Sequence, residues 1–541
     1  MKKRLLTIFG IVLMAAALFT VIHFIWSDLY IAEFDADNAE TVIWAEATLE
    51  SGRLADPDFH DYYVLIPVGG NLFFIPFVKA FGVGITALRA GYTVLAVIFA
   101  ALLVLALRAL QPSWDLAMIG AGLIMFCTTA TETLRDILWG HTVYYGVTVF
   151  CILMCIGSLA LYLRGKRAVG GILFFLSALF GSINGSAVLL FTVLPLTAAV
   201  LLESMNRERP SEGFMKGPIL LLGGAIVCGV ALNKCITSGI PTPHADLYTQ
   251  LAPAPQWGEN LRLLPERWLS LFFKLPTENV PAMSSAGIKL VLRLGTALVL
   301  SVMPFVSFFM PRESKPRLTR IVILYHWILC AVLLFFFIFG KISDYNHRLI
   351  PLWFSCLIVD WLTMVWMMKE KGYPRLAGIV SVCLTVLFAG MTAVSVTRQP
   401  ADLSVWYGNE SIYHVLESNG LTHGYSTHYW FTNSVTVLSE SRIKTLGVTV
   451  TEDGFEPAGY QNKNAWFKET PTEEKTFLVC QEWVVYQHPR LEDEAVEVLR
   501  STQYTPHNGE TDGFYILVYD HDIIAENLRE SASVNADTSE N

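Results

Sequence analysis

The sequence is poor in charged residues, because Asp, Glu, Lys and Arg make up only 16% of its 541 residues. Hydrophobic residues make up 53% of the chain. A soluble protein of this length carries more charge and lacks repeated apolar runs long enough to cross a membrane. The net charge of −9 gives no basis for binding nucleic acid, which requires a positively charged surface. We therefore predict a polytopic protein of the lipid bilayer.

Cysteine is also scarce, and its spacing excludes two common uses. Eight of the nine cysteines lie in apolar runs, and only Cys480 lies in a polar region. No two have the spacing of metal ligands or of an extracellular disulfide framework, so they are best explained as small buried hydrophobic residues. We expect no disulfide bond and no structural zinc. The sequence also lacks an internal repeat and an inverted pair of broken helices, which weakens a transporter interpretation.

The sequence does contain a series of apolar runs that reach, or nearly reach, the roughly 20 residues that a spanning helix needs. The first run follows three basic residues, and it is too long for a signal peptide, so we expect an uncleaved helix. A further apolar stretch, 64–84, is interrupted by proline, glycine and Lys79. The predicted crossings are 5–26, 86–107, 114–131, 143–163, 168–183, 186–203, 217–235, 286–310, 320–340, 347–368 and 375–396.

Lys and Arg are concentrated in every second connection between these runs, provided that 64–84 does not cross. Connections rich in Lys and Arg lie on the cytoplasmic side of a membrane. The pattern therefore predicts about eleven crossings of the plasma membrane, with the N-terminus inside, the C-terminus outside and 64–84 at the outer surface. The basic residues are Lys2, Lys3 and Arg4; Arg108; Arg164, Lys166 and Arg167; Arg207, Arg209 and Lys216; Arg312, Lys315, Arg317 and Arg320; and Lys369, Lys371 and Arg375.

The polar region after the last crossing is predicted to be a small extracytoplasmic α/β domain. Helices are predicted at Ser411–Glu417 and Glu492–Leu499, and strands at Gly424–His428, Thr476–Cys480 and Phe514–Val518. The tail is polar and rich in small residues, which indicates disorder. The predicted parts are a transmembrane domain, 1–397, with a long first outer loop, 27–85; the α/β domain, 398–526; and the disordered tail, 527–541.

The first outer loop begins with Glu33-Phe34-Asp35-Ala36-Asp37-Asn38-Ala39-Glu40, which holds four carboxylates in eight residues directly after the first apolar run. Carboxylates this close repel one another, and hydrocarbon nearby disfavours their charged forms further. Their placement favours a role in chemistry. The structural alternative is a solvated acidic loop at the start of a helix, with Asp37 or Asn38 as the cap.

A long first outer loop with paired acidic residues just after the first helix resembles the GT-C superfamily of polytopic membrane glycosyltransferases. Asp35-Ala36-Asp37 looks like the Asp-x-Asp or Glu-x-Asp motif of that superfamily, and 45–54 is similar to the helix and glycine turn that follow it. The resemblance includes the dolichyl-phosphate-mannose mannosyltransferase and aminoarabinose transferase group. It implies a polyprenyl-phosphate-linked sugar donor, inverting transfer, and a cell-envelope glycan, lipid or protein as acceptor on the outer face.

The resemblance also implies a general base in the first outer loop. By position in the motif it points to Asp37 first and Asp35 second, and a positioned base contributes typically about 10²–10⁴-fold to the rate. Glu40 and Glu33 would orient the substrate or bind a cation. The carboxylates Glu33, Asp35 and Asp37 permit a Mg²⁺ or Mn²⁺ site without requiring one.

A leaving phosphate requires cations or hydrogen-bond donors at the outer surface. Two short outer connections, 131–145 and 341–348, supply such residues, and the first outer loop adds one histidine. The predicted substrate-binding residues, besides Glu40, are Arg135, His141, Lys341, His347, Arg348 and His60.

Three of these residues have a structural alternative. Arg135 could form a local salt bridge with Glu132 or Asp136. Arg348 could extend from a helix end toward the membrane surface, as basic residues often do there. His60 lies among aromatic residues that more often anchor a protein at the interface.

Two other functions remain open from the sequence. A transporter or flippase would bury charges within its spans, and the main ones here are Asp360, Lys289 and Arg293. Lys289 and Arg293 lie near a helix end, and Asp360 is predicted near the cytoplasmic end of its helix. A non-catalytic envelope assembly protein would use its outer domain to bind a partner. Loss of function on deleting 398–541, with no effect of changing the first-loop acids, would indicate that last alternative.

Overall fold

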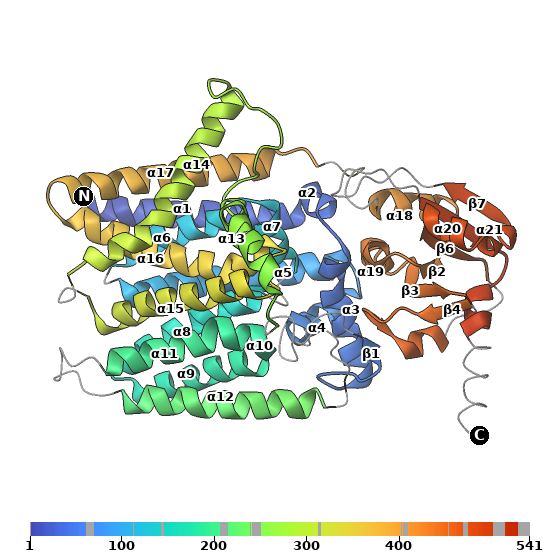
Figure 1. Cartoon of the computed structure of the whole chain (residues 1–541), viewed down its shortest axis with the longest axis horizontal. Coiled ribbons are helices and arrows are strands. Elements are labelled where there is room, and N and C mark those ends of the chain that lie inside the picture. The colour runs from blue at the N-terminus through green and yellow to red at the C-terminus, as the bar shows by residue number, and fades with distance from the viewer. Residues whose placement is uncertain are drawn as a thin grey trace.

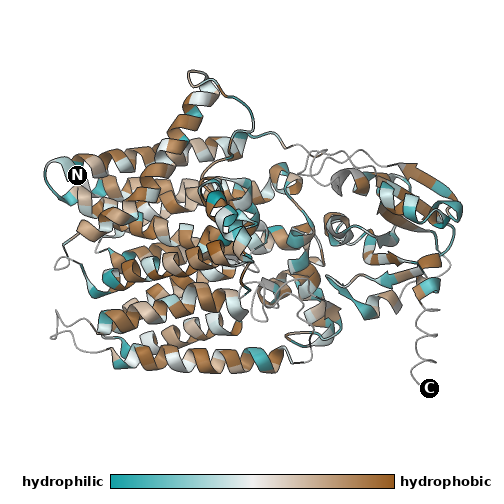
Figure 2. Cartoon of the chain, viewed as in Figure 1, coloured by the Kyte–Doolittle hydropathy of each residue, from teal (hydrophilic) through white to brown (hydrophobic). Residues whose placement is uncertain are grey.

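The structure is a computed structural model that describes residues 2–60, 70–111, 113–141, 145–205, 215–238, 240, 250–311, 315–401, 403, 409–452, 454–468, 474–500 and 514–528. The long helices run side by side in one bundle, and the C-terminal domain covers one end of it (Figure 1). The bundle is largely hydrophobic, whereas hydrophilic residues are frequent at the end that faces the C-terminal domain and within that domain (Figure 2). The chain is a multi-pass helical membrane protein, as predicted.

Each apolar run that was predicted to cross the membrane corresponds to a helix. Within the described ranges, nine helices are long and apolar enough to span singly, and a bent pair that begins with α6 would make a tenth. The remaining predicted run, 168–183, corresponds to α9, a shorter apolar helix of 17 residues. The helices are α1 (Lys2–Trp26), α5 (Ile85–Leu110), α6 (Trp114–Cys127), α8 (Tyr145–Leu163), α9 (Arg167–Ile183), α10 (Gly185–Val188) with η2 (Leu189–Val193) and α11 (Leu194–Ser204), α12 (Lys216–Ile236), α14 (Ser285–Val306), α15 (Arg317–Phe339), α16 (Ile350–Lys369) and α17 (Tyr373–Arg398).

Helix α16 is the central helix of the bundle, since 94% of its most apolar window is buried, against 17% for α12. Asp360 lies at the middle of α16 and not near its cytoplasmic end, so that prediction is wrong. The side chain is buried, and the Cys356 thiol donates to its Oδ2 at 3.5 Å. The predicted bounds, 347–368, nearly match the observed helix, Ile350–Lys369, so the error was in placing Asp360 near the end of a helix of that length.

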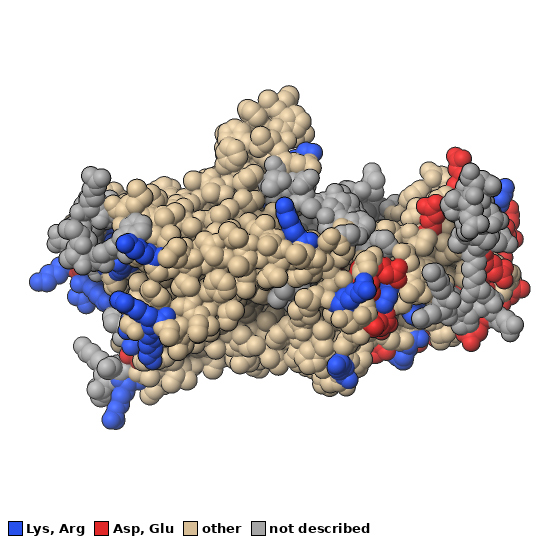
Figure 3. Space-filling view, turned by 90° about the horizontal axis from the view of Figure 1, so that it is seen from below, with Lys and Arg blue, Asp and Glu red and all other residues tan. Residues whose placement is uncertain are grey.

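Lys and Arg side chains gather at the end of the bundle that lies away from the C-terminal domain (Figure 3). The middle of the bundle surface seen in that view carries few charged side chains. At the basic end, Glu203 and Arg320 form a buried ion pair in which Arg320 Nε donates to Glu203 Oε1 at 2.9 Å. The two ends of the bundle therefore differ in charge as the alternating basic connections predict.

The apolar stretch 64–84 contains a short helix, α4 (Gly70–Phe81), and its residues 64–69 lie outside the described ranges. With 12 residues, α4 is too short to span a bilayer. It packs against α3 (Ala36–Ser51) and α5, at the end of the bundle nearest the C-terminal domain (Figure 1).

The C-terminal domain is built on a mixed six-stranded sheet with the strand order β4-β3-β2-β6-β8-β7. β2 is parallel to both β3 and β6, and the remaining pairs are antiparallel. The predicted first helix and the three predicted strands are present as α18, β2, β6 and β8. The elements are α18 (Asn409–Ser418), β2 (His423–Ser426), α19 (Tyr429–Leu438), β3 (Lys444–Thr451), β4 (Gly454–Pro457), β5 (Asn462–Lys463), η7 (Asn464–Lys468), β6 (Thr476–Gln481), α20 (Glu482–Gln487), α21 (Arg490–Asp493), β7 (Glu497–Arg500) and β8 (Phe514–Tyr519).

The helix predicted over Glu492–Leu499 is wrong. A short α21 ends at Asp493, and β7 follows as an edge strand antiparallel to β8, with Val498 opposite Leu517. The glutamates of this stretch favour a helix locally, but pairing with a fully buried neighbouring strand overrides a weak local preference.

The first outer loop and the C-terminal domain are packed together through a short two-stranded sheet. β1 (Phe59–His60) pairs antiparallel with β5. The Lys463 ammonium lies 3.0 Å from Glu50 Oε2 and 3.2 Å from Asp56 Oδ2, and the Trp466 indole N–H donates to the same Glu50 oxygen at 3.0 Å. The end of α3 and the strand that follows it are thus held by one lysine of the domain.

Replacing Lys463 by Met is expected to loosen the domain from the first loop. Two carboxylates, one of them buried, would lose their charged donor, and a hydrogen bond to a charged group contributes about 1.5–3 kcal/mol. Limited proteolysis of the purified protein should then cut the domain about tenfold faster. Arg442→Gln is the matched control, because its ion pair with Glu417 is largely exposed and contributes little. Equal cleavage of both variants would contradict the assignment.

Candidate functional site

The acidic cluster lies where the short helix α2 (Asp28–Ala32) meets α3. A second segment lies against it: α7 (Glu132–Arg135) and the π-helical turn η1 (Asp136–Gly140). The chain bends by 115° between α6 and this segment, so α7 and η1 run across the end of the bundle instead of continuing along it. Two connections that are about a hundred residues apart in sequence thereby form one site at the end of the bundle nearest the C-terminal domain (Figure 1).

Asp35 is the N-cap of α3, which differs from the predicted caps. Its side chain accepts from the Asn38 backbone N–H at 3.1 Å, and its own N–H donates to Asn38 Oδ1 at 2.8 Å, which is a reciprocal capping box. The Asp35 side chain is buried, so the cluster is not a solvated loop. Burial raises the pKa of Asp35 well above its usual range, and the negative charges of Asp136 and Asp37 raise it further.

Asn38 joins this cap to an acidic residue of the second segment. Its side-chain amide donates to Asp136 Oδ1 at 2.7 Å. Gly140 permits the approach, because a Cβ there would lie 2.5 Å from Asn38 Nδ2. The Gly140 carbonyl also accepts from the Tyr92 hydroxyl, which fixes the end of η1 to α5. Asp136, considered from the sequence only as a partner for Arg135, is therefore a member of the acidic cluster.

Asp37 lies in the first turn of α3 and differs from the other carboxylates in exposure. Its side chain is half-buried, whereas those of Glu33, Asp35 and Glu40 are buried. A carboxylate in the first turn is favoured by the helix dipole. Within the acidic cluster Glu33–Glu40, Asp37 is thus the carboxylate that a substrate can reach most easily.

Arg135 is buried and paired with Glu33. Its Nε donates to Glu33 Oε2 at 2.9 Å, its Nη2 contacts the other carboxylate oxygen, and its Nη1 donates to the Thr129 carbonyl at 3.3 Å. The guanidinium also lies over the Phe24 ring, 5.4 Å from its centroid. Burial raises the pKa of Glu33, and the charge of Arg135 opposes that shift. The salt bridge is therefore long-range in sequence and not the local pair considered as the alternative.

The carboxylates do not assemble into a metal site. Among the residues that the structure describes, no group of three His, Cys, Asp or Glu side chains is placed to hold an ion. Glu33 is engaged by Arg135, and Asp35 caps α3. The Mg²⁺ or Mn²⁺ site that Glu33, Asp35 and Asp37 permit does not fit this arrangement, and we derive no step through a metal ion.

Glu40, His141 and His347 come together beside the acidic cluster. Glu40 Oε2 lies 3.6 Å from His141 Nε2, and both side chains are buried. His347, in η6 (Asn346–Leu349), is close enough to His141 for an electrostatic interaction between the two rings. The Asn346 amide donates to Thr133 Oγ1 at 3.2 Å, which ties η6 to α7.

The other predicted basic residues have separate roles in the structure. Arg348 is buried, donates to the Lys341 carbonyl at 2.8 Å and lies over the Tyr345 ring, so it organises its own loop and does not extend to the membrane surface. Lys341 is exposed, and its ammonium donates to Gln250 Oε1 at 2.9 Å. His60 belongs to β1, and its side chain lies outside the described part of the structure.

Tyr30 of α2 is a residue that sequence reasoning missed. Its hydroxyl is buried without a hydrogen-bond partner among the described atoms, and it interacts electrostatically with Asp35, Asp136 and Tyr92. Burial raises the pKa of Tyr30 well above its usual range, so the phenol stays neutral and can donate. Nothing in the local spacing distinguishes this tyrosine from an interfacial anchor.

Comparison with known proteins gives a structural likeness without a sequence match. No family model matches the chain, and no curated protein matches it significantly. The crystal structure of ArnT from Cupriavidus metallidurans in the apo state matches with a TM-score of 0.50 and 10% identity over 96% of this chain and 98% of that one. The same protein bound to undecaprenyl phosphate gives a TM-score of 0.49, with 10% identity over 94% and 98%.

Proposed function

We propose that this chain, which has the fold of the GT-C glycosyltransferase ArnT, transfers a sugar from a polyprenyl-phosphate carrier to a cell-envelope glycan, lipid or protein. The observation that carries the proposal is the cluster of Asp35, Asp37 and Asp136 at the polar end of an apolar bundle with that fold. Buried acidic residues at such a position are costly, and they mark functional sites.

The transfer takes place on the outer face of the plasma membrane in this proposal. Lys and Arg gather at the opposite end of the bundle, and basic ends face the cytoplasm. The acidic cluster, the first outer loop and the C-terminal domain then lie outside, where envelope acceptors are found. The apolar bundle gives the polyprenyl chain of the donor a place in the bilayer next to the site.

Asp37 serves as the general base, because it is half-buried and reachable while Asp35 is engaged as a helix cap. It takes the proton of the acceptor hydroxyl as the acceptor oxygen bonds to the anomeric carbon. The bond between that carbon and the phosphate oxygen breaks, and its electron pair leaves with the carrier phosphate. Attack from the face opposite the phosphate inverts the anomeric configuration.

The leaving phosphate acquires charge as that bond breaks and requires donors nearby. His141 and His347 lie beside the cluster, and the Tyr30 hydroxyl is a buried donor without a described partner. Lys341 is an exposed cation on the same outer side, and Arg348 donates a hydrogen bond to its backbone carbonyl. Glu40 positions His141, and Arg135 acts through Glu33 by fixing α7 against the first loop.

Deletion of the gene is the direct test. We expect the mutant to accumulate a polyprenyl-phosphate-linked sugar and to lose one modification of its surface glycans, lipids or proteins. Both are measured by mass spectrometry of lipid extracts and of envelope fractions. An unchanged envelope together with an unchanged pool of lipid-linked sugars would overturn the proposal.

The same experiment separates the enzyme from the two alternatives. A flippase mutant would hold its lipid-linked sugar on the cytoplasmic leaflet, whereas a transferase mutant would hold it on the outer leaflet, where an added sugar-binding lectin reaches it. An assembly protein would lose function without any change in lipid-linked sugars.

A further inference from the structure

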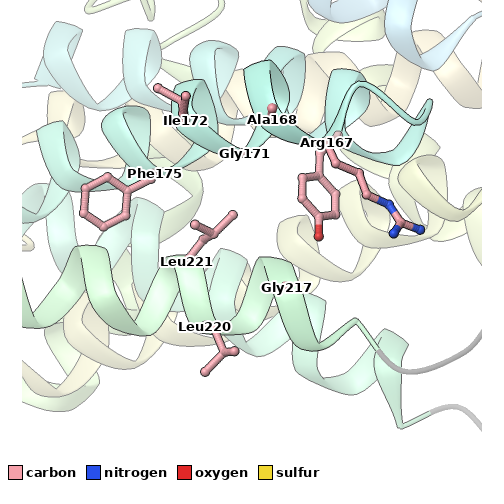
Figure 4. A pocket seen from close by; sticks show the side chains of 9 residues that line it. Arg167, Ala168, Gly171, Ile172, Phe175, Gly217, Leu220 and Leu221 are labelled. Carbon is pink, nitrogen blue, oxygen red and sulfur yellow. The ribbon is translucent and has the colours of Figure 1, made fainter.

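A groove of about 580 Å³ lies between α9 and α12 (Figure 4). Its lining residues Arg167 and Gly217 belong to the first turns of these helices, at the end of the bundle away from the C-terminal domain (Figure 1). Its wall is mostly hydrophobic, and Phe175 and Leu221 extend into the space between the two helices in that view. Ile172 and Leu220 on its rim are 61% and 74% exposed. In a membrane this groove is open to hydrocarbon and not to water.

The groove exists because the two helices touch at one end and are separated at the other. Near the far end, a Cβ at Gly229 of α12 would lie 2.3 Å from Ser182 Cβ of α9, so the backbones are in close contact there. At the basic end, Tyr162 of α8 fills part of the gap, since a Cβ at Gly217 would lie 2.0 Å from its hydroxyl oxygen. Gly171 lines the groove beside Leu221 and Tyr162, because a Cβ there would be in ordinary van der Waals contact with Leu221 at 3.5 Å.

The mouth of the groove is positively charged. Arg167 lines it, and Lys166 and Lys216 lie at the starts of the same two helices, α9 and α12. All three residues are exposed. None of them forms an ion pair with a described acidic residue. The N-termini of α9 and α12 add their partial positive charges at the same place. Tyr162 lines the groove at this end, and its hydroxyl adds a donor.

We infer that this groove is a binding site for an anionic phospholipid of the leaflet at the basic end. One acyl chain lies along Phe175 and Leu221, and the head-group phosphate lies at Arg167 beside Tyr162. A zwitterionic phospholipid carries a cation that the basic mouth repels, so the net charge of the head group decides the preference. Gly171 lines the groove, so a longer side chain at that position would take up space that the acyl chain occupies.

The inference is tested by native mass spectrometry of the full chain purified in detergent and titrated with phosphatidylglycerol or phosphatidylcholine. The first phosphatidylglycerol is expected to bind about fivefold more tightly than phosphatidylcholine, and Arg167→Gln should weaken only phosphatidylglycerol, by about fivefold. Gly171→Leu should weaken both lipids, because its side chain fills the groove. The readout does not depend on glycosyl transfer.

Two variants serve as matched controls. Arg375→Gln removes an exposed cation at the same end of the bundle, away from the groove, and Gly223→Leu adds the same side chain to α12 where no atom lies within 4 Å. Both should bind each lipid as the wild type does. Equal affinity of the wild type for the two lipids, or equal weakening by the control variants, would overturn the inference.

Discussion

Asp37→Asn is expected to insert and fold like the wild type and to lose sugar transfer by about 10²–10⁴-fold, the usual contribution of a positioned base. Asparagine keeps the shape of the side chain and removes only its ability to take a proton. Because Asp37 is half-buried at the start of α3 and does not cap the helix, the change leaves the capping box of Asp35 and Asn38 intact. Transfer is measured with purified protein, lipid-linked sugar and acceptor, or by complementation of the deletion strain.

Two further variants make this result specific. Asp35→Asn should lose much less activity, since an Asn side-chain oxygen can still cap α3 and Asn is as good an N-cap as Asp. Asp28→Asn, an exposed acid on α2, should be unaffected. A larger loss in the Asp35 variant than in the Asp37 variant would assign the base to Asp35. Normal transfer by both would leave the first loop without a base and would sink the mechanism.

Arg135→Met is expected to be the most destabilising single change in the site, by about 3–5 kcal/mol, because it leaves the Glu33 carboxylate buried without its cation. Removing both charges, as Glu33→Gln with Arg135→Met, should recover much of that loss. Thermal unfolding in detergent, compared across the two single variants and the double variant, gives the coupling between the residues. If the losses of stability in the two single variants simply add up in the double variant, the ion pair between Glu33 and Arg135 does not stabilise the site.

The instability of Arg135→Met should also depend on pH. Without the guanidinium, burial and the negative charge of Glu132 act on Glu33 unopposed, and its folded-state pKa rises further above the unfolded value. The folded state then binds more protons than the unfolded state, so stability falls as pH rises from the unfolded pKa toward the folded pKa. The deficit relative to wild type is expected to shrink when the pH is lowered from 8 toward 5. A deficit that is constant over this range would contradict the explanation.

The fold could be predicted to a large extent because its determinants are local. Length and apolarity define the crossings, so the polytopic architecture is confirmed. The whole chain has a fold like that of ArnT, at 10% identity. Strands such as β6 and β8 were recognised because their residues are continuously apolar. The predicted helix over Glu492–Leu499 was wrong because pairing with β8 lies outside any local window.

The site could be predicted only in part, for the same reason. The first-loop acids stand out locally, but the pairing of Glu33 with Arg135 and of Asn38 with Asp136 spans 102 and 98 residues. Such contacts depend on the 115° bend after α6, and no residue pattern in the sequence predicts that bend. Tyr30 could not be identified from the sequence, because its significance comes from the burial of its hydroxyl without a described partner and not from its residue type.

The pairing of β1 with β5 has a consequence for how the protein is made. Lys463 and Glu50 are 413 positions apart, and every membrane helix except α1 is synthesised between them. The first loop therefore leaves the ribosome long before its partner strand exists, and its contacts have the slow closure of very distant segments. The segment that holds Asp35 and Asp37 reaches its final packing only when the whole chain has been inserted. A chain that stops early would carry its acidic residues without the domain that covers α3. The site therefore becomes complete only after the C-terminal domain has been synthesised.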